Sequence, residues 1–161
     1  MTESERKQQQ EPAILVAVDF SEHAASALTY AAELTKRLDD RLIILHVIHD
    51  QAGGYYTDKK MKKGEKKRLK RLEEIAGEMM DELIQQQIEA HPEIKSTLKK
   101  AEIVLVAGLT VTKVLQVVEK TGPEMLVLGN KGHSSLKHIL LGSKAEQLAR
   151  LCPIPITLVK P

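Results

Sequence analysis

The sequence predicts an α/β protein built on an open, doubly wound, five-stranded parallel sheet with helices on both faces. Two observations support this prediction. Short, fully aliphatic runs recur along the chain, and amphipathic segments with helical spacing separate them. Because crossover helices cover both faces of a parallel sheet, its strands lack the polar and apolar alternation of half-exposed strands.

The chain is predicted to begin with a disordered tail over residues 1–11, which are polar and aperiodic, and to continue as a single domain over 12–161. The aliphatic run at 13–18 is the first strand. Ser21 is a good N-cap for the helix that follows, because apolar residues then recur at helical spacing as far as Leu38.

The remaining elements continue the same alternation. Residues 42–48 form the second strand, and a lysine-rich insertion follows at about 50–67. The periodicity of a long helix emerges from Arg68 and stops before Pro92. Three further strands are predicted at 102–108, 125–128 and 156–159. Two helices, at 111–122 and 143–151, separate them.

The composition restricts the class of protein. Hydrophobic residues make up 42% and charged residues 29% of the chain, as in ordinary globular proteins, whereas aromatic residues make up only 2%. The formal net charge of +2 is too balanced to favour nucleic acid or a membrane surface as the default partner. A single cysteine, Cys152, lies in an apolar run, and neither a membrane-spanning stretch nor a signal-peptide pattern occurs. We therefore expect a cytoplasmic protein with a buried thiol.

The stretch GNKGHSSLKHILLGS at residues 129–143 contains three of the nine glycines and follows the fourth strand. A side chain at Gly129 would block a ring or sugar lying against the strand tip. Gly132 would let main-chain N–H groups turn toward an anion, and Gly142 and Ser143 open a helix whose N-terminal N–H groups attract phosphate. Lys144 adds a positive charge. We predict a phosphate cradle, although the P-loop pattern GxxxxGK[ST] is absent; a flexible surface loop is the alternative.

With these residues the chain resembles the universal stress protein family, specifically its ATP-binding branch. That branch carries G-x2-G-x9-G-[ST] after the fourth strand, and the pattern is matched at every position by Gly129, Gly132, Gly142 and Ser143. The segment VAVDFSEHA resembles the end of the family's first strand, with Asp19 in the place of its acidic nucleotide contact. The resemblance spans about residues 12–160 and implies a Rossmann-like nucleotide-binding fold.

The resemblance also implies roles for individual residues. Asp19 and Gly129 would meet the adenosine, and Val47 would border the adenine through its main chain. Asn130, Lys131 and His133 stand where relatives often show other residue types, and Lys144 replaces a commonly apolar residue. The predicted cofactor-binding residues are Asp19, Val47, Gly129, Asn130, Lys131, Gly132, Gly142, Ser143 and Lys144.

The ligand and the assembly follow from the same resemblance. It implies ATP, with AMP or ADP as alternatives, and Mg²⁺ or Mn²⁺ bound through the phosphates. It further implies a homodimer formed through the last strand, Ile156–Val159. The histidines show no metal-ligand spacing with a carboxylate or cysteine, so we predict no metal site made by the protein alone.

Several residues have a purely structural interpretation. Asp19 could serve only the start of the following helix, in competition with Ser21 as its cap. The lysine run over 59–70 fits a lid over phosphates or a nucleic-acid patch, but the scarcity of aromatic stacking partners favours a solvated helix face.

One histidine and two methionines are interpreted as structural residues. We interpret His46, inside an apolar strand, as a core or pocket-edge histidine. Met79 and Met80 are expected to fill the core.

The function predicted from these features is a nucleotide-dependent regulatory or stress-response module with a protein partner that the sequence does not name. No general base accompanies the phosphate cradle, so we assign no catalytic residue and expect slow hydrolysis or none. Two alternatives stay open. One is an adaptor that binds no nucleotide. The other is an adenine-nucleotide-using enzyme, against which the absence of HxGH-type and SGGxDS-type motifs argues.

Overall fold

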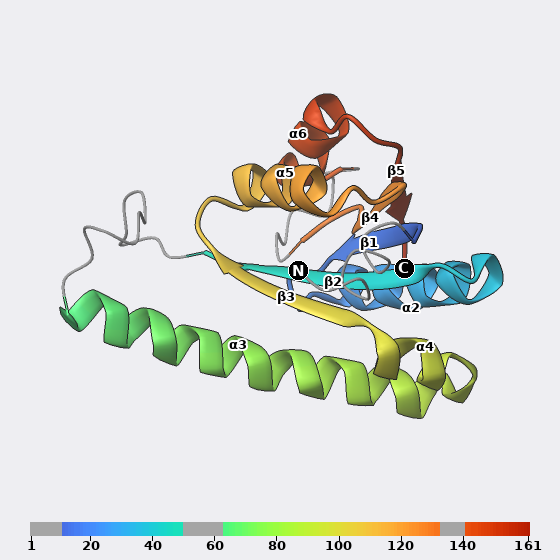
Figure 1. Cartoon of the computed structure of the whole chain (residues 1–161), viewed down its shortest axis with the longest axis horizontal. Coiled ribbons are helices and arrows are strands. Elements are labelled where there is room, and N and C mark those ends of the chain that lie inside the picture. Colours follow the sequence, from blue (N-terminus) through green and yellow to red (C-terminus); the bar gives the residue numbers. More distant parts are fainter. Residues whose placement is uncertain (1–10, 50–62, 133–140) are drawn as a thin grey trace.

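Five parallel strands form the centre of the protein (Figure 1). The structure is a computed structural model that describes residues 11–49, 63–132 and 141–161, so the predicted tail lies almost wholly outside the described residues. The sheet has the order β3-β2-β1-β4-β5. Its strands are β1 (Ala13–Ala17), β2 (Arg41–Ile48), β3 (Glu102–Ala107), β4 (Met125–Gly129) and β5 (Ile156–Val159).

Helices cover both faces of this sheet, which confirms the predicted fold class. Figure 1 shows α2, α3 and α4 on one side and α5 and α6 on the other. Their bounds are α2 (Glu22–Leu38), α3 (Lys63–Ala90), α4 (Lys95–Lys100), α5 (Thr110–Thr121) and α6 (Ser143–Leu151). None of the helices in the described ranges combines the length and apolar character needed to cross a bilayer.

The chain reverses its direction of winding between β1 and β4. It runs outward from β1 to β2 and β3, then returns to place β4 on the other side of β1 and β5 beyond it. In open parallel sheets the crevice at such a reversal, outside the carboxyl ends of the strands, is where ligands bind. Asp19 follows β1 at this place and Gly129 ends β4.

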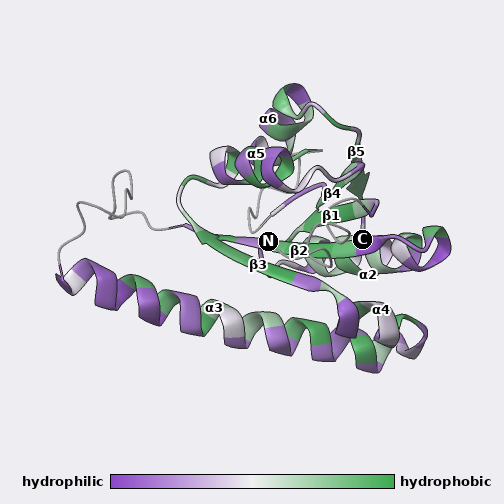
Figure 2. Cartoon of the chain, in the orientation of Figure 1, coloured by the Kyte–Doolittle hydropathy of each residue, from purple (hydrophilic) through white to green (hydrophobic). Residues whose placement is uncertain are grey.

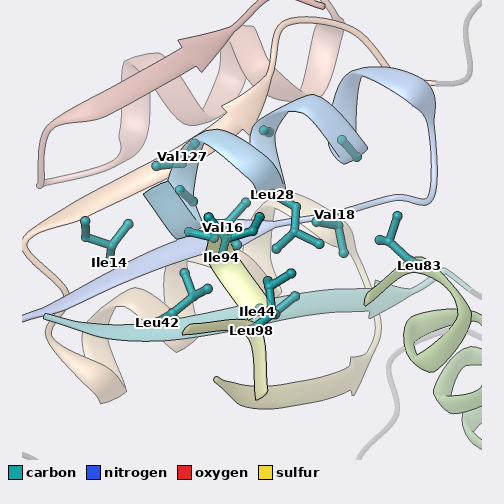
Figure 3. Close-up of a cluster of buried hydrophobic side chains, with 14 of the residues drawn as sticks. Ile14, Val16, Val18, Leu28, Leu42, Ile44, Leu83, Ile94, Leu98 and Val127 are labelled. Atoms are coloured by element: carbon teal, nitrogen blue, oxygen red, sulfur yellow. The ribbon is translucent and has the colours of Figure 1, made fainter. Parts of the chain in front are cut away.

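Two aliphatic clusters, one on each face, hold the helices to the sheet. One joins β1 and β2 to α2 and α3 (Figure 3), and the other joins the opposite side of the same strands to α5 and α6. Leu15, Ile43 and Leu126 are fully buried, as expected for central strands covered on both faces. Burial of this aliphatic surface is the main source of stability in a chain with so few aromatic residues.

The helical elements between β2 and β3 differ from the sequence predictions. Helix α3 begins at Lys63, earlier than the expected start near Arg68, while residues 50–62 of the insertion lie outside the described part of the chain. A 3-10 turn at Pro92–Ile94 and helix α4 were not predicted, and they bury Ile94 and Leu98 (Figure 3). Both elements are too short for a helical period to emerge.

The interpretation of Met79 as core filling is wrong. Met80 is fully buried, but the neighbouring Met79 is 42% exposed. Figure 2 shows why the two differ, since α3 is a surface helix on which hydrophilic and hydrophobic residues alternate. Adjacent positions on a helix point about 100° apart, so only one methionine can face the sheet.

The ends of α2 are set by local hydrogen bonds. Ser21 is the N-cap, and its side chain accepts a hydrogen bond from the Ala24 N–H at 3.2 Å, as predicted. At the other end Asp39 adopts the left-handed conformation with φ of 59° and closes the last turn. The capped first turn therefore fixes the start of α2 next to Asp19.

Candidate functional site

A cavity of about 620 Å³ opens at the carboxyl ends of the strands, where the winding reverses. Its size falls in the range typical of small-molecule sites. Eight of the nine predicted cofactor-binding residues line it: Asp19, Val47, Gly129, Lys131, Gly132, Gly142, Ser143 and Lys144. The fold thus brings together residues that are far apart in the sequence.

Asp19 is held in place by the start of α2. Its Oδ1 atom accepts hydrogen bonds from the main-chain N–H of Ser21 at 3.1 Å and from the Ser21 hydroxyl. The two residues therefore do not compete as caps, because Ser21 caps the helix and Asp19 orients Ser21. Both contacts use Oδ1, and the Oδ2 atom lies beside Gly132.

The glycines of the motif have different local constraints. A Cβ atom at Gly132 would lie 2.6 Å from Asp19 Oδ2, so the loop approaches the carboxylate as closely as only glycine permits. A Cβ at Gly129 would lie 2.8 Å from the main-chain carbon of His23 in α2. The expectation that Gly129 makes room for a ring or sugar is thus incomplete, since the packing of α2 already requires glycine there.

The N-terminus of α6 forms the polar end of the cavity. Gly142 is the N-cap, and its N–H donates to Asn130 O at 2.7 Å while its carbonyl accepts from the Glu146 N–H at 2.9 Å. Ser143, Lys144 and Ala145 of the first turn line the cavity. Main-chain N–H groups in a first turn lack partners within the helix, so this end is suited to bind an anion.

Asn130 is the predicted residue that does not line the cavity. It is buried, and its Oδ1 atom accepts a hydrogen bond from Nδ1 of His23 at 2.7 Å. Its main-chain N–H donates to Val159 O at 3.1 Å. Asn130 thus ties the loop after β4 to both α2 and β5, and the geometry gives it a positioning role.

Val47 lies near the carboxyl end of β2, on the opposite side of β1 from β4, the strand that leads to α6. The carbonyl of Leu45 accepts from the Val18 N–H at 2.8 Å, so the main-chain groups of Leu45 face the β1 side. Main-chain groups two residues apart point to the same side of a strand. Those of Val47 are therefore directed past the end of β1, toward the crevice.

Helix α3 supplies part of the cavity wall that the sequence analysis missed. Leu72, Ile75, Ala76 and Met79 all line the cavity. Their spacing of three and four residues was visible as an amphipathic face, but a periodic pattern cannot tell a face that covers a sheet from one that borders a cavity. The lysines of α3 in the described residues, Lys63, Lys66, Lys67 and Lys70, are exposed, consistent with a solvated helix face.

His46 is a pocket-edge histidine, as interpreted from the sequence. Its Nδ1 atom lies 2.8 Å from Val18 O, and its ring centroid lies 4.3 Å from that of Phe20. Burial lowers the pKa of the imidazole below its ordinary value of 6.5, against opposing effects of the Val18 hydrogen bond and the Asp19 charge. Phe20 has a φ of 62°, an unusual conformation for a non-glycine residue that places its ring against His46.

Cys152 was expected to be buried and is half-buried. It packs against the aliphatic cluster under α5 and α6. Within residues 11–49, 63–132 and 141–161, no group of three or more His, Cys, Asp or Glu side chains is arranged to hold a metal ion. His133 lies outside the described residues.

Comparisons with known proteins place the chain in one family. The universal stress protein family matches residues 12–160. The universal stress protein MJ0577 of Methanocaldococcus jannaschii is 27% identical over 151 residues, covering 91% of this chain and 93% of that protein. The universal stress protein YxiE of Bacillus subtilis is 26% identical over 154 residues, covering 91% and 97%.

Solved structures agree in fold. UspA of Lactobacillus plantarum superimposes with a TM-score of 0.66 at 19% identity, covering 92% of this chain and 97% of that one. The structure of MJ0577 superimposes with a TM-score of 0.61 at 26% identity, covering 94% and 96%. Since the family match extends over nearly the whole described domain, the chain belongs to the universal stress protein family.

Proposed function

We propose that this protein binds ATP, with Mg²⁺ or Mn²⁺ held through the phosphates, and acts as a nucleotide-dependent regulatory module of the stress response. AMP or ADP is the alternative ligand. The observation that carries the proposal is the convergence of eight predicted cofactor-binding residues on one cavity at the reversal of strand order. A chance arrangement of surface-loop glycines would have no reason to meet Asp19 and Val47 there.

The two ends of the cavity suit the two ends of a nucleotide. The first turn of α6, with Lys144 and the nearby Lys131, offers N–H groups and positive charge to phosphates. The wall formed by Val47, Ile75 and Met79 is apolar and suits a purine ring. Asp19, close to Gly132, carries the acceptor that a ribose hydroxyl requires.

Relatives of the same fold provide further support. One universal stress protein was solved in complex with cAMP, and a universal stress protein from Archaeoglobus fulgidus was solved in complex with dAMP. Both ligands contain an adenine base and one phosphate group. An adenine nucleotide is therefore the ligand class that we propose for this chain.

The proposed role is regulatory because the phosphate end of the described cavity offers no side chain arranged as a general base. Asp19, the carboxylate among the described residues that line the cavity, binds Ser21 through its Oδ1 atom. We expect ATP turnover far below the roughly 1 s⁻¹ of a dedicated enzyme. Measurement of phosphate release with the purified protein and Mg²⁺ tests this; turnover of several per second would favour the enzyme alternative.

The first experiment is isothermal titration of the nucleotide-stripped protein with ATP and Mg²⁺. We expect saturable binding of about one ATP per chain, and loss of that binding in Gly142→Asp, because the new carboxylate would repel phosphates at the α6 N-terminus. Gly64→Asp is the matched control, since a side chain at Gly64 has open space and lies outside the cavity lining. Absence of binding to the unmodified protein would leave the adaptor as the leading function.

A further inference from the structure

Helix α3 carries its charged residues in two blocks of opposite sign. Residues 63–71 include six Lys or Arg and one Glu, whereas residues 72–90 include six Asp or Glu and no Lys or Arg. The helix macrodipole attracts negative charge to the N-terminus and positive charge to the C-terminus. The dipole of α3 therefore gives no reason for this order of charges.

The outer face of α3 shows the same division. Adjacent residues on a helix point about 100° apart, so a residue two positions from a buried one lies on nearly the opposite side. Glu74 and Glu78 are each two positions from the buried Ala76. Steps of three or four residues from these two define an exposed stripe, here called the outer stripe, that is basic in its first half and acidic in its second: Lys63, Lys67, Arg71, Glu74, Glu78 and Asp81.

The charges of the outer stripe have no partner within the described chain. Figure 1 shows α3 at the margin of the molecule, with the sheet on its inner side and no described element beyond it. Figure 2 shows that the exposed side of this helix is strongly hydrophilic. Among the described residues, none of the six stripe residues forms an ion pair. Both halves of the stripe are thus exposed to another molecule.

The outer stripe is complementary to itself when its direction is reversed. An antiparallel pair of α3 helices, with a two-fold axis between Arg71 and Glu74, places Lys67 opposite Glu78 of the second copy. The same axis places Arg71 opposite Glu74 of the second copy, and each contact occurs twice. An anionic lipid surface or a nucleic acid, in contrast, would attract the basic half and be repelled by the acidic half.

We propose that the outer stripe is a self-association surface on which a second copy of this chain docks with its α3 antiparallel. The surface is separate from the β5 edge, because α3 packs against β2 and β3 while β5 lies at the other end of the strand order. Exposed ion pairs each contribute little and are screened by salt, so the contact is weak and strengthens at low ionic strength. It requires no nucleotide and does not depend on the proposed function.

Sedimentation equilibrium at about 20 mM and about 0.5 M salt tests the inference, because the Debye length falls from roughly 20 Å to roughly 4 Å between them. At low salt the unmodified protein should gain mass with concentration, toward twice the mass of its high-salt particle. Lys67→Glu with Arg71→Glu makes the stripe largely acidic, and Glu74→Lys with Glu78→Lys makes it largely basic. Each double variant should lower the low-salt association constant about tenfold or more.

Two combinations should restore the association. An equimolar mixture of the double variants pairs an acidic stripe with a basic one. The chain with all four substitutions reverses the order of charges but is again complementary to itself. Lys99→Glu with Lys120→Glu, at exposed positions of α4 and α5, is the matched control. It changes the net charge as much as Lys67→Glu with Arg71→Glu and should leave the association unchanged.

The outcomes decide the inference in either direction. No gain in mass at low salt, or an equal gain in the unmodified protein and both double variants, would overturn it. Loss of association that neither the mixture nor the four-substitution chain recovers would also overturn it, because the stripe residues would then not act by pairing with each other. Urea denaturation should give all variants nearly the midpoint of the unmodified protein, since the substituted positions are exposed.

Discussion

At the scale of single residues, the glycines of the motif look equivalent in the sequence, but the space around each of them in the fold is different. Gly129 is required by the protein itself, since its Cβ would meet the main chain of His23. At Gly142 the nearest main-chain atoms would lie 3.5 Å or more from a Cβ, an ordinary contact. The described packing therefore tolerates a side chain at Gly142, in contrast to Gly129, and the reason that we propose for glycine at this position is the approach of a ligand.

This difference leads to a prediction for two alanine variants. Gly129→Ala should lower the free energy of unfolding by about 1–3 kcal/mol, because neither the β4 backbone nor the α2 backbone can shift freely. Gly142→Ala should leave stability nearly unchanged and weaken ATP binding. Urea denaturation and calorimetry on both variants check the prediction. Equal stability of the two variants would contradict it.

His46 leads to a prediction about pH. Its folded-state pKa lies below the ordinary value of 6.5, so the unfolded chain takes up a proton first as the pH falls. The stability associated with neutral His46 is fully present above about pH 6.5, is lost as the pH falls toward the folded pKa, and does not change further below it. Urea midpoints compared between pH 7.5 and pH 5.5 should fall more in the unmodified protein than in His46→Asn. Equal decreases in both proteins would show that other groups cause the loss.

At the scale of elements, α3 contains a glycine that lowers its helix propensity and that the packing of the helix does not require. Gly77 lies in the interior of this helix, where glycine costs more backbone entropy than alanine. A Cβ there would lie 3.9 Å from Leu105 Cδ1, an ordinary van der Waals contact with β3. The position therefore has room for a methyl group.

Gly77→Ala should stabilise the protein by about 0.5–1 kcal/mol through the higher helix propensity of alanine. Gly122→Ala is the matched control, because Gly122 ends α5 with φ of +58° and alanine there should destabilise by about 1–2 kcal/mol. Chemical denaturation of the two variants should give shifts of opposite sign. If Gly77→Ala destabilised the protein, the added methyl group would not fit between α3 and Leu105 of β3, although a Cβ atom there would lie 3.9 Å from Leu105 Cδ1.

At the scale of the whole molecule, β5 presents an open edge. Within the described residues it pairs only with β4, and the carbonyls of Pro155 and Val159 accept hydrogen bonds from the N–H of Leu126 in β4 and of Asn130 just after it. Because main-chain groups alternate in direction, those of Ile156 and Leu158 point away from β4. Such an edge can pair with a second copy, and we propose that the homodimer implied by the family resemblance forms through it.

A charged residue on this edge should prevent that pairing. Leu158 is 37% exposed, so Leu158→Lys should preserve the fold and convert a dimer into a monomer. Leu109→Lys, at a more exposed position between β3 and α5, is the control that should leave the dimer intact. Sedimentation analysis measures the mass of each variant. A Leu158→Lys protein with the mass of a dimer would place the interface elsewhere.

The sequence predicted most of the fold because each long element carries its own signal. The strand around Leu15 is aliphatic throughout and the strand around Ile43 is largely so, and Ser21 caps α2 through the N–H of the residue three positions later. Such signals depend on neighbours in the chain and can be read without the fold. The glycine spacing and the family pattern likewise indicated eight residues that line the cavity.

What remained depended on contacts between distant segments. Only packing against α2 turned Asn130 toward His23, and only the seating of α3 on the sheet separated exposed Met79 from buried Met80. The tautomer of His46 also required the position of β1, because the Val18 carbonyl that follows this strand accepts the Nδ1 hydrogen. The sequence by itself determined the long elements and eight of the residues that line the cavity, because those signals are local. The tertiary structure decided which atoms of those residues face the cavity, because that depends on chain segments brought together only by folding.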